Sequence, residues 1–145
     1  NIFLETRLAS DAMEALPNEI VWSPRDVDEV AANGQVRVFW DDTPIDLFFT
    51  YHLFHEQAEA NTDEVPFLDT RIPILGATEL AVFKAFFNRT KDWADIEAMY
   101  DAGSLDIHEV IGWMVDLLGP DDHRVLRLRD LLRREPPTSE PRFMA

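Results

Sequence analysis

The amino-acid sequence predicts an α+β fold, with a β-sheet in the N-terminal half and about four helices in the C-terminal half. Short β-prone runs alternate with helical segments as far as residue 75, and four apolar stripes at helical spacing follow without another strand. A chain of 145 residues is long enough to bury a sizeable core. We therefore expect one domain over residues 1–135, helical from about residue 77 to 134, and a flexible tail at 136–145.

Composition favours a cytoplasmic protein and argues against several kinds of site. Hydrophobic residues make up 46% of the chain, and no apolar run approaches the roughly 18 residues of a membrane span. The N-terminus has no signal-peptide layout. Because cysteine is absent, disulfides, thiolate metal sites and cysteine nucleophiles are excluded.

The charge balance is strongly acidic. Thirteen basic residues against 28 acidic ones give a net charge of −15. Such a chain repels a phosphate backbone, so nucleic acid is not expected to bind this chain alone. A small anionic substrate would need a local cationic pocket or bridging metal ions.

The first predicted elements are short and are separated by turn residues. The pattern predicts a strand at Ile2–Leu4, a helix at Arg7–Leu16, a strand at Ile20–Trp22 and a helical turn at Val27–Ala31. Apolar residues at helical spacing support the helix, and Pro17 ends it.

A β-hairpin is predicted next. Gln35–Trp40 alternates between two faces, Asp41–Pro44 is a strong turn signal, and Ile45–Phe49 is a second β-prone run. Asp46 interrupts this apolar strand, where a buried carboxylate is costly unless it is paired, hydrogen-bonded or bound to metal. Both an Asp that accepts backbone N–H bonds at a strand end and an Asp that binds a metal ion are compatible with this position.

Between this hairpin and the helical half, the pattern is mixed. It predicts a helix at Tyr51–Ala60, a polar loop at Asn61–Glu64, and extended pieces at Pro66–Leu68 and Arg71–Leu75. Prolines in both extended pieces are typical of edge strands.

His52 and His55 lie one turn apart on the predicted helix and could chelate a metal ion. No third ligand is evident from the spacing, so a solvated helix face is the simpler interpretation. The sequence also lacks a Gly-x-Ser-x-Gly nucleophile motif and the glycine-rich loops that cradle phosphates.

Four helices are predicted in the C-terminal half. Thr78 is expected to cap the first, Thr90 the second, and Asp106 the third as part of an Asp-x-x-Glu capping box. Asp121 and Asp122 start the last helix, whose arginines face solvent or a partner. The apolar stripes are Leu80, Phe83 and Phe87, then Trp93, Ile96 and Tyr100, then Ile107, Val110, Ile111, Met114, Val115 and Leu118, and finally Val125, Leu128, Leu131 and Leu132.

Charged residues gather where the first two of these helices meet. The only two lysines of the chain, Lys84 and Lys91, both lie here, although arginine is the usual cation of this sequence. A retained lysine indicates a use for its compact ammonium group. Asp92 and Asp95 lie in the first turn of the second helix, where the helix dipole favours carboxylates. They are either capping acids in a surface network or the carboxylates that hold Lys84 toward a polyphosphate.

Together these segments resemble the nucleotidyltransferase superfamily with the DNA-polymerase-β-like fold, and most of all the abortive-infection (AbiEii-type) and related small bacterial nucleotidyltransferase proteins. The resemblance covers roughly residues 1–102 and implies a mixed β-sheet. It ends at Arg89–Ile96, which is similar to the Arg-x-Lys-Asp-x-x-Asp segment of those proteins. The earlier segments that carry it are Ile2–Leu4, Val36–Val38, Ile45–Phe48 and Ile72–Leu75.

The resemblance assigns roles to three residues. In that family a Gly-Ser turn and an Asp-x-Asp strand bind two divalent metal ions, and a neighbouring strand supplies a third carboxylate. Asp46 matches that third carboxylate and metal ligand, Lys84 matches the phosphate-facing lysine, and Asp92 matches the acid that positions the lysine or acts as a base. The implied cofactors are Mg²⁺ and a nucleoside triphosphate, and the implied activity is nucleotidyl transfer to RNA or protein.

The Gly-Ser turn and the Asp-x-Asp pair have no match, and the chain is expected to begin directly after them. Because a lone Asp46 cannot hold two metal ions ~3.5–4 Å apart, we expect no turnover by this chain. The alternative is a non-catalytic interaction module, whose acidic body binds a basic protein partner or whose C-terminal helices form a homodimer. A small-molecule hydrolase with a metal ion at His52 and His55 is a third hypothesis.

Overall fold

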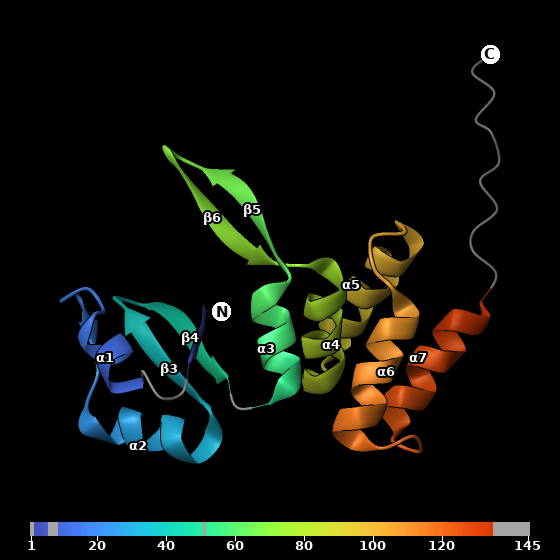
Figure 1. Ribbon diagram of the computed structural model, residues 1–145, viewed down its shortest axis with the longest axis horizontal. Coiled ribbons are helices and arrows are strands. Elements are labelled where there is room, and N and C mark those ends of the chain that lie inside the picture. Colours follow the sequence, from blue (N-terminus) through green and yellow to red (C-terminus); the bar gives the residue numbers. More distant parts are fainter. Residues whose placement is uncertain (1, 6–8, 51, 135–145) are drawn as a thin grey trace. The chain divides into compact units, whose positions relative to one another are not determined.

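The computed structural model describes residues 2–5, 9–50 and 52–134, with the backbone alone for residues 2–5 (Figure 1). Its contacts divide the chain into two compact units, Asn1–Ala60 and Asn61–Ala145. The prediction of one domain over residues 1–135 therefore stays a prediction, and the predicted tail at 136–145 lies outside the described residues. The α+β class is confirmed.

The elements follow in the order that the sequence predicts, strands with helices first and then four helices. They are β1 (Ile2–Glu5), α1 (Ala9–Glu14), β2 (Ile20–Val21), α2 (Pro24–Asn33), β3 (Gln35–Trp40), β4 (Thr43–Thr50), α3 (Leu53–Ala60), β5 (Thr62–Phe67), β6 (Thr70–Leu75), α4 (Ala77–Phe87), α5 (Thr90–Asp101), α6 (Ile107–Leu118) and α7 (His123–Arg133). No helix among the described residues is long and apolar enough to cross a bilayer.

The first unit contains a four-stranded mixed sheet in the order β1-β4-β3-β2. Strand β1 runs parallel to β4, and the other neighbours are antiparallel. Alternation along β3 and β4 sends every second side chain to the face that α1 and α2 cover. The core on that face comprises Ala9, Met13, Ile20, Val30, Val36, Val38, Leu47 and Phe49.

The β3–β4 hairpin is confirmed, and its two-residue turn fixes the register. Asp41 lies in the left-handed region (φ +50°), which Asp tolerates better than most residues. Trp40 pairs with Thr43 across the turn, and the same register sets Arg37 directly opposite Asp46.

Several predicted helix bounds change at their ends. The predicted helix at Arg7–Leu16 is observed over Ala9–Glu14, and residues 6–8 lie outside the described residues. The predicted turn at Val27–Ala31 extends to Pro24–Asn33, because Pro24 suits the first turn and the Asp26 carboxylate accepts the Ser23 N–H. Helix α3 begins at Leu53, and Tyr51 is not described.

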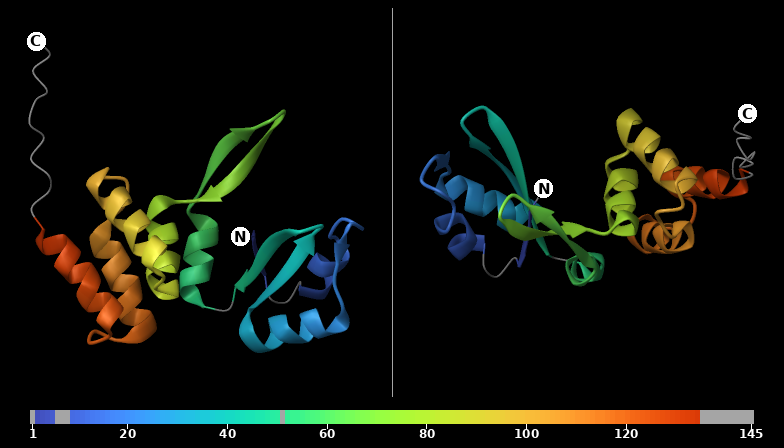
Figure 2. Two further views of the ribbon diagram at one scale, coloured as in Figure 1. Left: turned by 180° about the vertical axis from the view of Figure 1, so that it is seen from behind. Right: turned by 90° about the horizontal axis from the view of Figure 1, so that it is seen from above.

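The second unit is built on α4–α7 (Figure 2). Helix α4 packs against α5 and α6, and α6 packs against α7. The capping box at Asp106 is confirmed in part, since its carboxylate accepts the N–H groups of His108 (3.0 Å) and Glu109 (3.1 Å). The buried side chains of these helices include Ala81, Val82, Phe83, Ala85, Trp93, Ile96, Ile107, Val110, Met114, Val125, Leu128 and Leu131.

Two predicted helix caps are wrong. Helix α4 begins after Gly76, and the Thr78 hydroxyl instead accepts the backbone N–H of Asp106, 2.9 Å away. Thr90 is the first residue of α5, and Arg89 occupies the cap position with its N–H donated to Asp92. In both places a tertiary or neighbouring partner replaces the local cap that the threonine would supply.

The predicted polar loop at Asn61–Glu64 is also wrong, because Thr62–Glu64 belong to strand β5. This strand pairs with β6 in a separate two-stranded sheet. Thr62, Asp63 and Glu64 are polar in succession, so this part of β5 lacks the polar and apolar alternation that identifies a half-buried strand.

The arginines of α7 fasten this helix to its own unit. Arg124 donates to the carbonyl of Phe86 (3.0 Å), and the Arg134 guanidinium pairs with Glu97 (3.2 Å). The Arg127 guanidinium lies 4.2 Å from the centre of the Trp93 ring, a cation–π contact. Contacts within the second unit therefore explain these three arginines, and no partner protein is needed to explain them.

Candidate functional site

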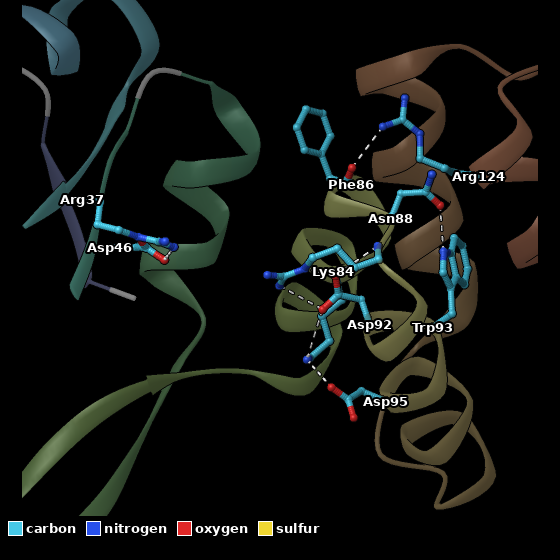
Figure 3. Close-up of polar contacts among 10 residues, drawn as sticks. Arg37, Asp46, Lys84, Phe86, Asn88, Asp92, Trp93, Asp95 and Arg124 are labelled. Atoms are coloured by element: carbon cyan, nitrogen blue, oxygen red, sulfur yellow. Dashed lines mark hydrogen bonds and ion pairs between the residues drawn. The ribbon is translucent and has the colours of Figure 1, made fainter. Parts of the chain in front are cut away.

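The candidate site lies at the corner between α4 and α5. Lys84 lies in the last turn of α4, and Asn88 ends that helix in the left-handed conformation (φ +59°). Helix α5 starts two residues later, so Asp92 falls in its first turn, facing back toward Lys84 (Figure 3). The short connection between the helices is what brings these residues together.

Lys84 is held between two carboxylates. Its Nζ atom lies 2.6 Å from Oδ2 of Asp95 and 3.9 Å from Oδ1 of Asp92. The Lys84 side chain is 20% exposed, and its hydrogen bond to Asp95 lies at the surface. The structure therefore brings together the predicted pair Lys84 and Asp92.

Asp92 is the buried centre of this corner. Its side chain is 1% exposed, and its carboxylate accepts three hydrogen bonds from Arg89. The donors are Nε (2.6 Å), Nη2 (3.1 Å) and the backbone N–H (3.2 Å). The hydrogen bond from the Arg89 side chain is the main reason that the pKa of Asp92 is lowered, although burial opposes it. A carboxylate with a lowered pKa is a weak base, so this position suits a residue that holds Lys84 better than a general base.

The corner rests on a rigid support. The Trp93 side chain is buried, and its Nε1–H donates to Oδ1 of Asn88 (2.8 Å). The amide nitrogen of Asn88 lies 3.2 Å from Nε2 of His123 at the start of α7. Because Asn88 is bonded on both sides, the end of α4 is fixed relative to α5 and α7.

The charges at this corner balance, and the two carboxylates differ in exposure. Lys84 and Arg89 supply two positive charges against Asp92 and Asp95. Asp92 is buried and fixed, whereas the Asp95 side chain is 55% exposed. A phosphate group approaching from solvent would therefore compete with Asp95 alone for the Lys84 ammonium.

Asp46 lies in the first unit and is not buried, contrary to the prediction. Its side chain is 32% exposed because it points away from the core, between the inward-facing Ile45 and Leu47. Arg37 binds it with two hydrogen bonds of 2.6 and 2.9 Å. The hydrogen bond to Asp46 raises the pKa of Arg37. Asp46 is thus paired, one of the three situations that make a strand carboxylate tolerable.

The described residues do not fit a pair of divalent metal ions. They contain no group of three or more His, Asp or Glu side chains placed to hold a metal. Both oxygens of Asp46 already accept hydrogen bonds from a guanidinium. Two-metal chemistry needs several carboxylates to hold the two metal ions.

The two histidines also make contacts that stabilise helix α3. The rings of His52 and His55 lie 6.4 Å apart in an edge-to-face arrangement, and Nδ1 of His52 accepts the N–H of Phe54 (3.0 Å). Burial, followed by the charge of His52, lowers the pKa of His55 to about 4. His55 is therefore a neutral, buried part of α3 at neutral pH.

Two partners of the predicted residues were missed, Arg37 and Arg89, whereas the pairing of Asp95 with Lys84 agrees with one of the two predicted interpretations. The pairing of Arg37 with Asp46 follows from the two-residue turn at Asp41 and Asp42. This turn pairs Trp40 with Thr43, and three residues further along each strand the register pairs Arg37 with Asp46. Arg89 lies three residues before Asp92, the spacing at which a first-turn acid reaches back to the cap.

No protein-family model matches the chain, and neither the curated proteins nor the solved structures contain a match. Function therefore has to follow from the residues and their geometry.

Proposed function

We propose that the chain is a nucleotidyltransferase-like domain whose α4–α5 corner contacts the phosphates of a nucleoside triphosphate. Lys84 makes the contact, Asp92 positions Lys84, and Arg89 holds Asp92. The arrangement around Lys84 carries the proposal: its ammonium group pairs with the exposed Asp95 and lies 3.9 Å from the buried Asp92, whose lowered pKa keeps it ionised at neutral pH. A cation that is fixed before the ligand arrives loses less conformational freedom on binding.

The proposed reaction of the family-like site is nucleotidyl transfer. Asp46 is the proposed metal-side carboxylate, and RNA or protein is the proposed acceptor, in the cytoplasm. Because Asp46 is paired with Arg37 and the described residues hold no metal group, we expect this chain to bind nucleotide without transferring it.

Equilibrium binding of each nucleoside triphosphate tests the proposal, with and without Mg²⁺. We expect Lys84→Gln to weaken binding roughly tenfold or more, because a charge-assisted hydrogen bond contributes about 1.5–3 kcal/mol. Lys91→Gln is the matched control, since Lys91 is the other lysine and is exposed on the same helix corner. If no triphosphate binds the wild-type chain, or if both variants weaken binding equally, the proposed site is wrong.

A transfer assay tests the second part. Incubation with Mg²⁺ and each labelled triphosphate is expected to leave protein and added RNA unlabelled. Robust transfer by this chain would contradict the proposal that it binds without turnover, and would leave the proposed phosphate contact intact.

A non-catalytic interaction module is the second candidate. The net charge of −15 and the lack of a metal group among the described residues favour it. Partner binding that survives both Asp46→Ala and Lys84→Ala, together with no nucleotide binding, would support this candidate over the first.

A further inference from the structure

The β5–β6 hairpin is anchored at its base. Gly76 donates its backbone N–H to the carbonyl of Asn61 (3.3 Å), and the Asn61 side chain donates to the Glu79 carboxylate (2.9 Å). A Cβ atom on Gly76 would meet that carboxylate and lie 3.1 Å from the Asn61 carbonyl oxygen, so a larger residue here would displace the Glu79 side chain. Apart from this anchor, strands β5 and β6 contact mainly each other within the second unit.

One face of this hairpin carries several apolar side chains, which are exposed or half-buried. The strand register places second neighbours and their paired residues on the same side. Phe67 is 55% exposed, Ile74 is 42% exposed, and Leu68 in the turn is 89% exposed. A two-stranded hairpin is only marginally stable by itself. When exposed apolar side chains gather on such a hairpin, they indicate a contact surface. We name Val65, Phe67, Leu68, Ile72 and Ile74 the hairpin apolar patch.

The turn residue adds an independent observation. Leu68 has a left-handed backbone (φ +50°), which a bulky residue adopts at a cost that glycine or asparagine avoids. The Leu68 side chain is almost fully exposed, so it adds little burial to the fold. A strained, apolar and exposed residue at the end of a hairpin points to a contact made by its side chain.

We propose that the hairpin apolar patch binds a protein partner whose apolar pocket is rimmed by basic side chains. The charge around the patch selects this partner. Asp63 lies on the same face as the patch and Asp69 lies in the turn beside it, within a chain of net charge −15, whereas Glu64 pairs with Arg71 (3.5 Å). Basic side chains at the rim of the pocket would therefore speed encounter and favour the correct partner.

The same charge disfavours two other occupants. A second copy of this chain would bring equal negative charge to the interface, and a nucleic acid would bring its phosphates. The proposal is independent of the nucleotide site, because the hairpin and the Lys84 corner share no residue.

Selection from a displayed library of short random peptides, with the full chain as bait, tests this proposal. Leu68→Gly removes the side chain and relieves the backbone, so this variant should unfold at the same or a higher urea concentration than wild type. Phe67→Ser is the second variant. Leu126→Ser on α7 is the control, because Leu126 is another exposed leucine, 46% exposed, on a different element.

We expect the enriched peptides to combine basic and apolar residues and to bind more weakly as salt rises. Their affinity should fall by roughly tenfold or more with Leu68→Gly and Phe67→Ser, and stay unchanged with Leu126→Ser. Failure to enrich any peptide, or enriched peptides that are acidic or bind all variants equally, would overturn the proposal. A dimer in sedimentation that Leu68→Gly dissociates would also overturn it, since the occupant would then be a second copy.

Discussion

Each unit of this protein carries a carboxylate bound by a guanidinium, and burial separates the two pairs. Asp46 and Arg37 face each other on open strands, 32% and 58% exposed. Asp92 is 1% exposed, accepts three N–H groups of Arg89 and lies 3.9 Å from Lys84. The same residue types therefore make a solvent-screened surface contact in one unit and the organising centre of a helix corner in the other.

Removing each carboxylate should give the largest difference between the units. Asp92→Ala leaves Arg89 and Lys84 without their buried partner and should lower the free energy of unfolding by about 3 kcal/mol. Asp46→Ala should cost much less, because solvent already screens its pair. Urea unfolding at neutral pH measures both. Equal losses for the two variants would show that burial does not distinguish them.

Acid should distinguish the units a second time, through His55. An unfolded chain protonates histidine near pH 6.5, whereas buried His55 has a pKa of about 4. The unfolded state therefore binds more protons between these values, and stability falls by up to roughly 3 kcal/mol as pH drops from about 6.5 to 4. Asp92 acts in the other window: its pKa is lowered, so its contribution is lost only below its ordinary pKa near 3.9.

Urea unfolding at pH 7 and pH 4.5 measures this effect. His55→Gln should remove most of the pH dependence, whereas His108→Gln, which changes an exposed histidine on α6, should leave it unchanged. A variant with the wild-type pH dependence would contradict the assignment to His55.

A smaller effect is expected from Asp95, the exposed competitor for Lys84. Asp95→Asn removes a charge that an incoming phosphate must displace, so the affinity for inorganic tripolyphosphate should rise by roughly threefold to tenfold. Titration calorimetry measures this change. Asp101→Asn, on the same helix and also exposed, is the control, and an equal rise there would indicate a general charge effect.

Periodicity and turn chemistry predicted the class of fold, the β3–β4 hairpin and the four C-terminal helices. What they missed depends on contacts between distant segments. The Thr78 hydroxyl is taken by Asp106, a partner 28 residues away, so the local capping rule fails there. The start of strand β5 was missed because Thr62, Asp63 and Glu64 are polar in succession and show no alternation.

The site was predictable to a similar extent. The proximity of Lys84 and Asp92 was predictable, because the two residues have opposite charges and lie at facing ends of successive helices. The short connection between these helices keeps the two side chains close together. The exposure of Asp46 was missed because its neighbours are apolar, although strand alternation places Asp46 on the face opposite Ile45 and Leu47. The complete burial of Asp92, a first-turn acid, is not revealed by any local pattern.

The central claim is that Lys84, and not merely the charge of the chain, contacts the phosphates of a nucleotide. The chain contains only two lysines, so a sample labelled with carbon-13 at the lysine side chains gives one set of NMR signals for Lys84 and one for Lys91. Titration with nucleoside triphosphates should shift the Lys84 signals in a saturable way and leave those of Lys91 in place. Saturable shifts at neither lysine, or equal shifts at both, would contradict the claim.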